Sequence, residues 1–137
     1  MNPINIWSIL VSVLVSFGIG ALWYSPLLFG KEWMTLIGMS EKDLAETRMS
    51  RVWGSYVIQI VVSIISICIL SFAISAIGTW SFSDGAFIGF FAWLGFVVPV
   101  GISELLWRKI PGKLFLIDTV YYLLAFTISG AIIAAWY

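Results

Sequence analysis

Four long apolar segments alternate with short polar connections along the chain. The segments are residues 4–24, 52–77, 84–107 and 114–136, with approximate bounds, and they contain few charged residues. A helix rises about 1.5 Å per residue, so each segment is long enough to cross the roughly 30 Å hydrocarbon core of a bilayer. The pattern predicts an all-α fold, a bundle of four transmembrane helices that forms one domain over residues 1–137.

The first segment combines a defined end with a regular row of small side chains. We expect the helix to end at Trp23-Tyr24-Ser25-Pro26, because Pro26 lacks an N–H group and disfavours helical backbone at Ser25. This turn sets the depth of the helix in the membrane, or it docks a partner or a lipid headgroup. Small residues recur on one face and let another helix approach closely: Ser8, Ser12, Ser16 and Gly20. Further candidates for close packing lie in the third and fourth segments: Gly85, Gly89 and Gly130.

Residues 26–51 form the longest polar connection. A short helix over 31–37, closed by Gly38, has the pattern of an interfacial segment. Ser40 then has the position of a helix cap that accepts a hydrogen bond from the Asp43 N–H group. We therefore expect a short amphipathic or charged helical segment between the first two spans, continuing to about Arg51.

The third segment is the least regular of the four. Gly95, Pro99 and Gly101 fall close together, and Pro99 removes the backbone hydrogen bond to the Gly95 carbonyl. The sequence therefore predicts a proline kink. Such a kink is either a packing feature alone or the lining of a substrate cavity, since irregular backbone at membrane depth needs protein or water around it.

The composition supports a membrane protein and removes several kinds of chemistry. Hydrophobic residues make up 61% of the chain and charged residues 10%, against about 25% charged in soluble domains. Histidine is absent and Cys68 is the single cysteine, within an apolar run, so the usual general base and metal ligand are missing. We see no nucleophile–base pair, metal cluster or phosphate loop. We expect no enzyme activity, no metal, no cofactor and, with a net charge of zero, no nucleic-acid partner.

The basic residues are distributed asymmetrically. All seven lie in the first and third connections: Lys31, Lys42, Arg48, Arg51, Arg108, Lys109 and Lys113. By the positive-inside rule these connections face the cytoplasm, and both chain ends face outward. We therefore predict a multi-pass protein of the cell (inner or plasma) membrane with N-out, C-out topology and a cytoplasmic segment between helices one and two.

Two stretches carry a resemblance to a known family. The first is residues 22–34, LWYSPLLFGKEWM, and the second is residues 114–118, LFLID, followed by Tyr121, Gly130 and Trp136. Together they resemble a family of small bacterial and archaeal membrane proteins that is catalogued only as a domain of unknown function. The resemblance covers the whole chain and implies four transmembrane helices. It also implies asparagine at the position of Asp118.

Two acids are the main candidates for chemistry. Glu104 and Asp118 lie near the cytoplasmic ends of neighbouring helices, and an acid at membrane depth costs roughly 3 kcal/mol or more at the bilayer centre. One interpretation is a pair of interfacial ion pairs that fix the connection 108–113. The other is a proton- or cation-binding acid in a cytoplasmic vestibule. Gln59, Ser63 and Tyr121 complete the candidate polar network, which otherwise serves as hydrogen-bonding glue between helices.

Two functions remain as hypotheses. The first is a small transporter or channel that acts as a homo-oligomer in the lipid bilayer, because four helices enclose little space. The second is a membrane accessory or assembly protein without transport, which binds an unknown protein partner through residues 31–51.

Overall fold

The computed structural model describes residues 4–46 and 49–136, and every regular element in these ranges is helical. The first span is α1 (Ile6–Trp23) and the second is α4 (Met49–Ile77). The third consists of α5 (Phe82–Ala92), the π-helical turn η1 (Trp93–Val97) and α6 (Val98–Trp107), and the fourth is α7 (Gly112–Ala135). Each of the four is long and apolar enough to cross a membrane, which confirms the predicted fold class.

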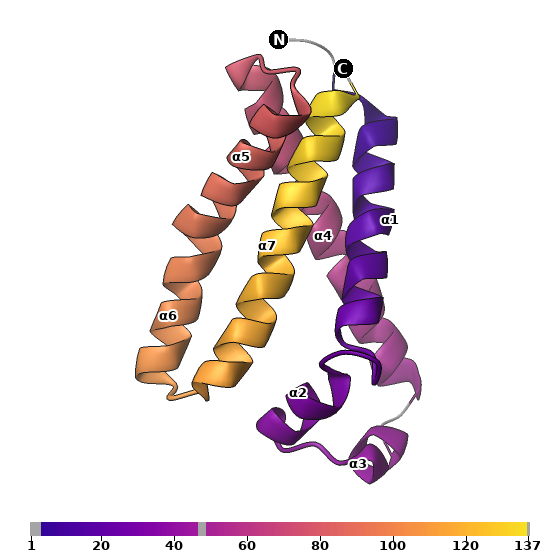
Figure 1. Ribbon diagram of the computed structural model, residues 1–137. Coiled ribbons are helices and arrows are strands. Elements are labelled where there is room, and N and C mark those ends of the chain that lie inside the picture. The colour runs from indigo at the N-terminus through magenta and orange to yellow at the C-terminus, as the bar shows by residue number, and fades with distance from the viewer. Residues whose placement is uncertain (1–3, 47–48, 137) are drawn as a thin grey trace.

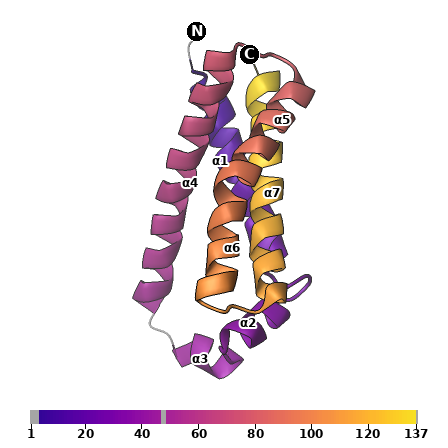
Figure 2. The ribbon, with the colours of Figure 1, turned by 90° about the vertical axis from the view of Figure 1, so that its left-hand side faces the viewer.

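The four spans form an elongated bundle with α7 at its centre (Figures 1 and 2). Helix α7 contacts α1, α4, α5 and α6. Both chain ends lie at one end of the bundle, which we call the terminal end. The α6–α7 turn and the short helices α2 (Gly30–Ile37) and α3 (Glu41–Glu46) lie at the other, which we call the basic end. The described basic residues lie there: Lys31, Lys42, Arg51, Arg108, Lys109 and Lys113. Arg48 is outside the described residues.

Local sequence signals account for the short helices. Gly38 ends α2 with a φ of 77°, which a glycine adopts without strain. The Asp43 N–H group donates to Ser40 Oγ at 3.1 Å, and the Ser40 N–H group donates to Asp43 Oδ2 at 2.9 Å. These reciprocal bonds begin α3 and lower the pKa of Asp43, because Ser40 donates to its ionised form. The helix expected to continue to Arg51 is described to Glu46, residues 47–48 lie outside the described residues, and the next described helix, α4, begins at Met49.

In the third span, Pro99 does not lie within a regular run of α-helical hydrogen bonds, because the turn before it is π-helical. The Val98 N–H group donates to the Trp93 carbonyl, five residues earlier, in the π-helical turn η1. Pro99 follows shortly after this turn, and the shifted hydrogen-bond register there accommodates a residue that has no N–H group. The irregularity expected from the proline is thus a π-helical turn, a feature that frequently marks functional sites in helices.

Helices α5 and α7 approach each other at backbone distance. A Cβ atom added at Gly85 would overlap the Gly130 carbonyl, and one added at Gly130 would overlap the Gly85 carbonyl. A Cβ atom at Gly89 would overlap the carbonyl oxygen of Phe126. These positions admit glycine alone, so the glycines expected to allow close packing lie in one helix–helix contact.

The apolar core is concentrated toward the terminal end. Its buried cluster joins three helices: Ile9 and Val13 of α1, Ile67, Leu70 and Ile74 of α4, and Ile133 and Ala134 of α7. The half of α4 nearer the basic end is different, since residues 53–62 are all exposed. The bundle is therefore closely packed at one end and open along α4 at the other.

Candidate functional site

The turn that follows α1 is attached to the second turn of α7. Trp23 Nε1 donates to the Ile117 carbonyl oxygen at 3.0 Å. The Tyr24 hydroxyl donates to Asp118 Oδ1 at 2.7 Å, and the rings of Tyr24 and Tyr121 meet edge to face with centroids 5.5 Å apart. The two stretches that carry the family resemblance therefore contact each other, although they lie 94 residues apart in the chain.

The same turn is closed by its own backbone. The Gly30 N–H group donates to the Ser25 carbonyl at 2.9 Å, and the Phe29 N–H group donates to the Trp23 carbonyl at 3.0 Å. A Cβ atom at Gly30 would lie 2.7 Å from the Ser25 carbonyl carbon, closer than real contacts allow. Outside the turn, Glu32 of α2 forms an ion pair with Lys113 of α7. The turn and α2 are therefore held against the start of α7 by several independent contacts.

Asp118 is held by neutral hydrogen-bond donors. Besides Tyr24, Trp33 is a second uncharged neighbour that favours the ionised carboxylate. Burial raises the pKa of Tyr24 above its usual value, and the hydrogen bond to Asp118 raises it further, so this hydroxyl stays a donor. Within residues 4–46 and 49–136, Asp118 takes part in no ion pair. Glu104 does, because Arg108 Nη1 lies 2.9 Å from its Oε2, the i,i+4 pairing that the sequence suggests.

Both acids line a single crevice between α6 and α7 at the basic end, which we call the α6–α7 crevice. Its volume is about 350 Å³. Its polar lining consists of Glu104, Arg108, Asp118, Thr119 and Tyr122, and the rest is mostly apolar, including Phe115. With both carboxyl groups ionised, two negative charges face one positive charge, which leaves an excess of one negative charge in the crevice.

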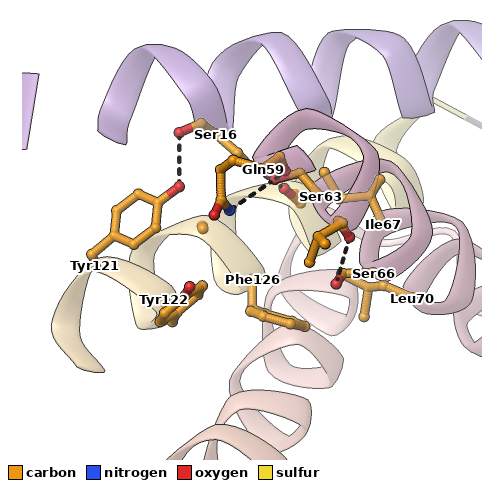
Figure 3. Close-up of a pocket in the computed structure, with 12 residues that line it drawn as sticks. Ser16, Gln59, Ser63, Ser66, Ile67, Leu70, Tyr121, Tyr122 and Phe126 are labelled. Carbon is orange, nitrogen blue, oxygen red and sulfur yellow. Dashed lines mark hydrogen bonds between the residues drawn. The ribbon is translucent and has the colours of Figure 1, made fainter. Parts of the chain in front are cut away.

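A second hollow lies between α1, α4 and α7, and we call it the inner groove (Figure 3). Its polar lining comes from the first, second and fourth spans and includes the candidates Gln59, Ser63 and Tyr121. The other polar lining residues are Ser16, Ser66, Tyr122 and Ser129, and the rest of the lining is apolar. Tyr121 donates to the Ser16 carbonyl at 3.3 Å, and the hydroxyls of Ser16 and Ser129 are 3.0 Å apart. Gln59 reaches from α4 toward the tyrosines of α7 and lies 3.5 Å from Ser63 Oγ.

The remaining candidates occupy the contacts between helices. Ser8, Ser12 and Ser16 are buried along α1. A Cβ atom at Gly20 would lie 3.2 Å from the Tyr121 ring, so the row of small residues on α1 ends where that ring packs. These residues thus lie on the face of α1 that meets the bundle, whereas Glu104, Asp118, Gln59 and Ser63 line the two hollows.

Sequence reasoning overlooked one residue that lines the hollows and two tryptophans that pack near them. Tyr122 is the residue that lines both the crevice and the groove. Tyr122 is four residues after Asp118, so the two lie on one helix face, and this spacing could have predicted that Tyr122 belongs to the site. Trp33 had no such signal, since its contact with Asp118 depends on how the turn folds. The same holds for Trp93, whose Nε1 donates to the Thr119 carbonyl at 2.8 Å.

The comparisons with known proteins identify a family without a function. Comparison with curated proteins and with solved structures finds no match. A family model described as "Protein of unknown function (DUF1761)" matches residues 7–134, nearly the whole chain. The chain therefore belongs to this family of proteins of unknown function, as the two sequence stretches that meet at Asp118 suggest.

Proposed function

We propose that the protein is a small transporter or channel of the cell's inner or plasma membrane, working as a homo-oligomer. The observation that carries the proposal is the α6–α7 crevice, in which Glu104 and Asp118 share one hollow within the third and fourth spans. Acids are costly inside a membrane span, and they typically face a water-filled cavity on a substrate or ion pathway. The positive-inside rule puts the mouth of this crevice in the cytoplasm.

The charges in the crevice favour a cationic substrate. Arg108 offsets the charge of Glu104, whereas Asp118 is held by Tyr24 and Trp33, which carry no charge. When both carboxyl groups are ionised, Asp118 therefore supplies the excess negative charge. The rings of Phe115 and Tyr122 add faces on which a cation can rest.

The open side of the bundle supports assembly from several copies. Residues 53–62 of α4 are exposed, and Gln59 is a polar side chain among them at membrane depth. Amide side chains in spans commonly form hydrogen bonds across a helix interface. A second copy against α4 would remove this amide from lipid and enclose the hollows further.

Flux through purified protein in proteoliposomes tests this proposal. We expect cation flux to fall at least about tenfold in Asp118→Asn, because the excess negative charge is lost while an acceptor for Tyr24 remains. Glu104→Gln removes the partner of Arg108 and should also reduce flux. Glu41→Gln, at an exposed site in α3, is the matched control and should not change it. Flux that is absent in the wild type, or unaffected by both crevice variants, contradicts the proposal.

A second function is favoured by the exposure of α3. Its described side chains Glu41, Lys42, Asp43 and Glu46 all face solvent, while α2 is anchored on α7. This arrangement suits an accessory protein that presents residues 31–51 to a cytoplasmic partner. Replacing residues 40–46 by a flexible linker of equal length should then abolish co-purification of that partner and leave the bundle folded. If no protein is lost from the purified sample, this alternative fails.

A further inference from the structure

We infer that the inner groove binds a small monovalent cation, such as ammonium or an alkali-metal ion. The inference rests on the proposed function and deepens it, because it adds a second binding site for the cation besides the α6–α7 crevice. The site itself requires only that the groove binds the ion at equilibrium.

Three hydroxyl groups that line the groove donate their hydrogens to backbone carbonyls. Tyr121 donates its hydroxyl hydrogen to the Ser16 carbonyl, Ser63 donates to the Gln59 carbonyl and Ser66 donates to the Val62 carbonyl. A carbonyl oxygen cannot donate, so the direction of these three bonds is fixed. One further hydrogen is used between Ser16 and Ser129. The oxygens of these side chains keep unused lone pairs, and a ligand that fits them is a hydrogen-bond donor or a metal cation.

Gln59 adds the most accessible acceptor. Its amide nitrogen points toward Ser63 Oγ, at 3.5 Å, so the amide oxygen has no partner in that contact. The side chain is exposed on the open side of α4, where lipid offers no hydrogen bond. In Figure 3 it extends over the space beside Tyr121 and Tyr122. A cation held there would satisfy the amide oxygen together with the hydroxyl oxygens nearby.

Charge and size narrow the class of cation. The groove lining includes no Asp, Glu, Lys or Arg, so its ligands are neutral oxygens. Divalent metal ions in proteins usually require carboxylates, whereas a single positive charge can be held by neutral oxygens and nearby negative charge. The groove volume is about 50 Å³, room for roughly three water-sized bodies. A monovalent ion that keeps one or two waters fits this space.

The neighbouring crevice would supply the ion. Tyr122 lines both hollows, so they lie on the two sides of one side chain. The excess negative charge near Asp118 raises the local concentration of cations on the crevice side. The groove would then receive from the crevice an ion that has already lost part of its water.

Equilibrium binding to protein in lipid nanodiscs tests the inference. Radioactive sodium and rubidium are the direct probes, and ammonium chloride is compared with choline chloride at constant ionic strength by the shift in unfolding temperature. We expect saturable binding of at least one of these ions. Gln59→Leu should weaken it at least about tenfold, because a hydrogen-bonding group to a charge is lost at nearly constant size. Tyr121→Phe is the second variant and should also weaken binding.

The control and the contradicting outcomes separate this inference from the proposed function. Ser55→Ala removes an exposed hydroxyl of the same helix outside the groove and should leave binding unchanged. Absence of saturable binding, or binding that Gln59→Leu and Tyr121→Phe leave intact, overturns the inner site even if the crevice variants still control flux. Saturable binding without flux supports the site and overturns transport. Flux driven by protons alone, with no cation bound, overturns the site.

Discussion

The two ends of the bundle are packed in opposite ways. Toward the terminal end, α5 and α7 meet at glycines, and a buried cluster from α1, α4 and α7 fills the interior. Toward the basic end, α4 is exposed along residues 53–62, and the crevice lies between α6 and α7. The inner groove lies between the two ends, since its lining runs from Gln59 to Ile67 and Leu70 of the buried cluster. The closest packing is thus at the terminal end and the charged crevice is at the basic end, so substitutions at the two ends should affect stability differently.

The largest expected effect is at the glycine contact of the packed half. Gly130→Ala should destabilise the protein by about 3 kcal/mol, because the new Cβ atom overlaps backbone of α5, which can only respond by moving the helix away. Unfolding in a denaturing detergent, followed by circular dichroism, measures the change. Gly18→Ala is the control, since a Cβ atom there meets nothing within 4 Å. Equal stability of the two variants would show that the close approach of α5 and α7 is not essential.

A smaller effect is expected where the turn is attached to α7 in the open half. Tyr24→Phe removes the donor to Asp118 and leaves a partly buried carboxylate with one donor fewer, which should cost about 1–3 kcal/mol of unfolding free energy. The same unfolding measurement applies. Tyr56→Phe, at an exposed tyrosine of α4, should be nearly neutral. A neutral Tyr24→Phe would mean that packing of the turn, and not its hydrogen bond, holds it in place.

The smallest effect sharpens the comparison inside the packed half. Ser12 Oγ is buried and, within the described part of the chain, has no hydrogen-bond partner. Ser12→Ala should therefore stabilise the protein by about 1 kcal/mol. Ser129→Ala removes the bond to Ser16 and should destabilise it by about 1 kcal/mol. If both variants shift stability in the same direction, the row of hydroxyls acts through its size alone.

The helices were predictable because their causes are local. Hydropathy placed the four spans, and the Ser40–Asp43 capping pattern placed the start of α3. The irregularity at Pro99 was expected as a kink, but its form as a π-helical turn depends on which carbonyl accepts from Val98. That choice reflects packing of the whole third span and is not visible in the residues around Pro99.

The candidate site was predictable only in part. Spacing indicated the pair Glu104–Arg108, and helix periodicity grouped Gln59 with Ser63 on α4. One of the two interpretations paired Asp118 with a basic residue, whereas its hydrogen-bond partner in the described residues is Tyr24, which reaches Asp118 because the turn after α1 folds back on α7. A contact between segments 94 residues apart depends on the tertiary structure, and no local sequence pattern predicts it.

The central position of α7 has a consequence for how the protein is made. This helix follows the other three spans in the chain, yet it contacts all of them, and its contacts with α5 and α1 are the most extensive. Among the described residues, the contacts between spans that do not involve α7 are mainly those of α1 with α4, with a smaller contact of α4 with α5. We therefore expect the bundle to close only once α7 is in place, and chains truncated before α7 to be cleared by membrane proteases.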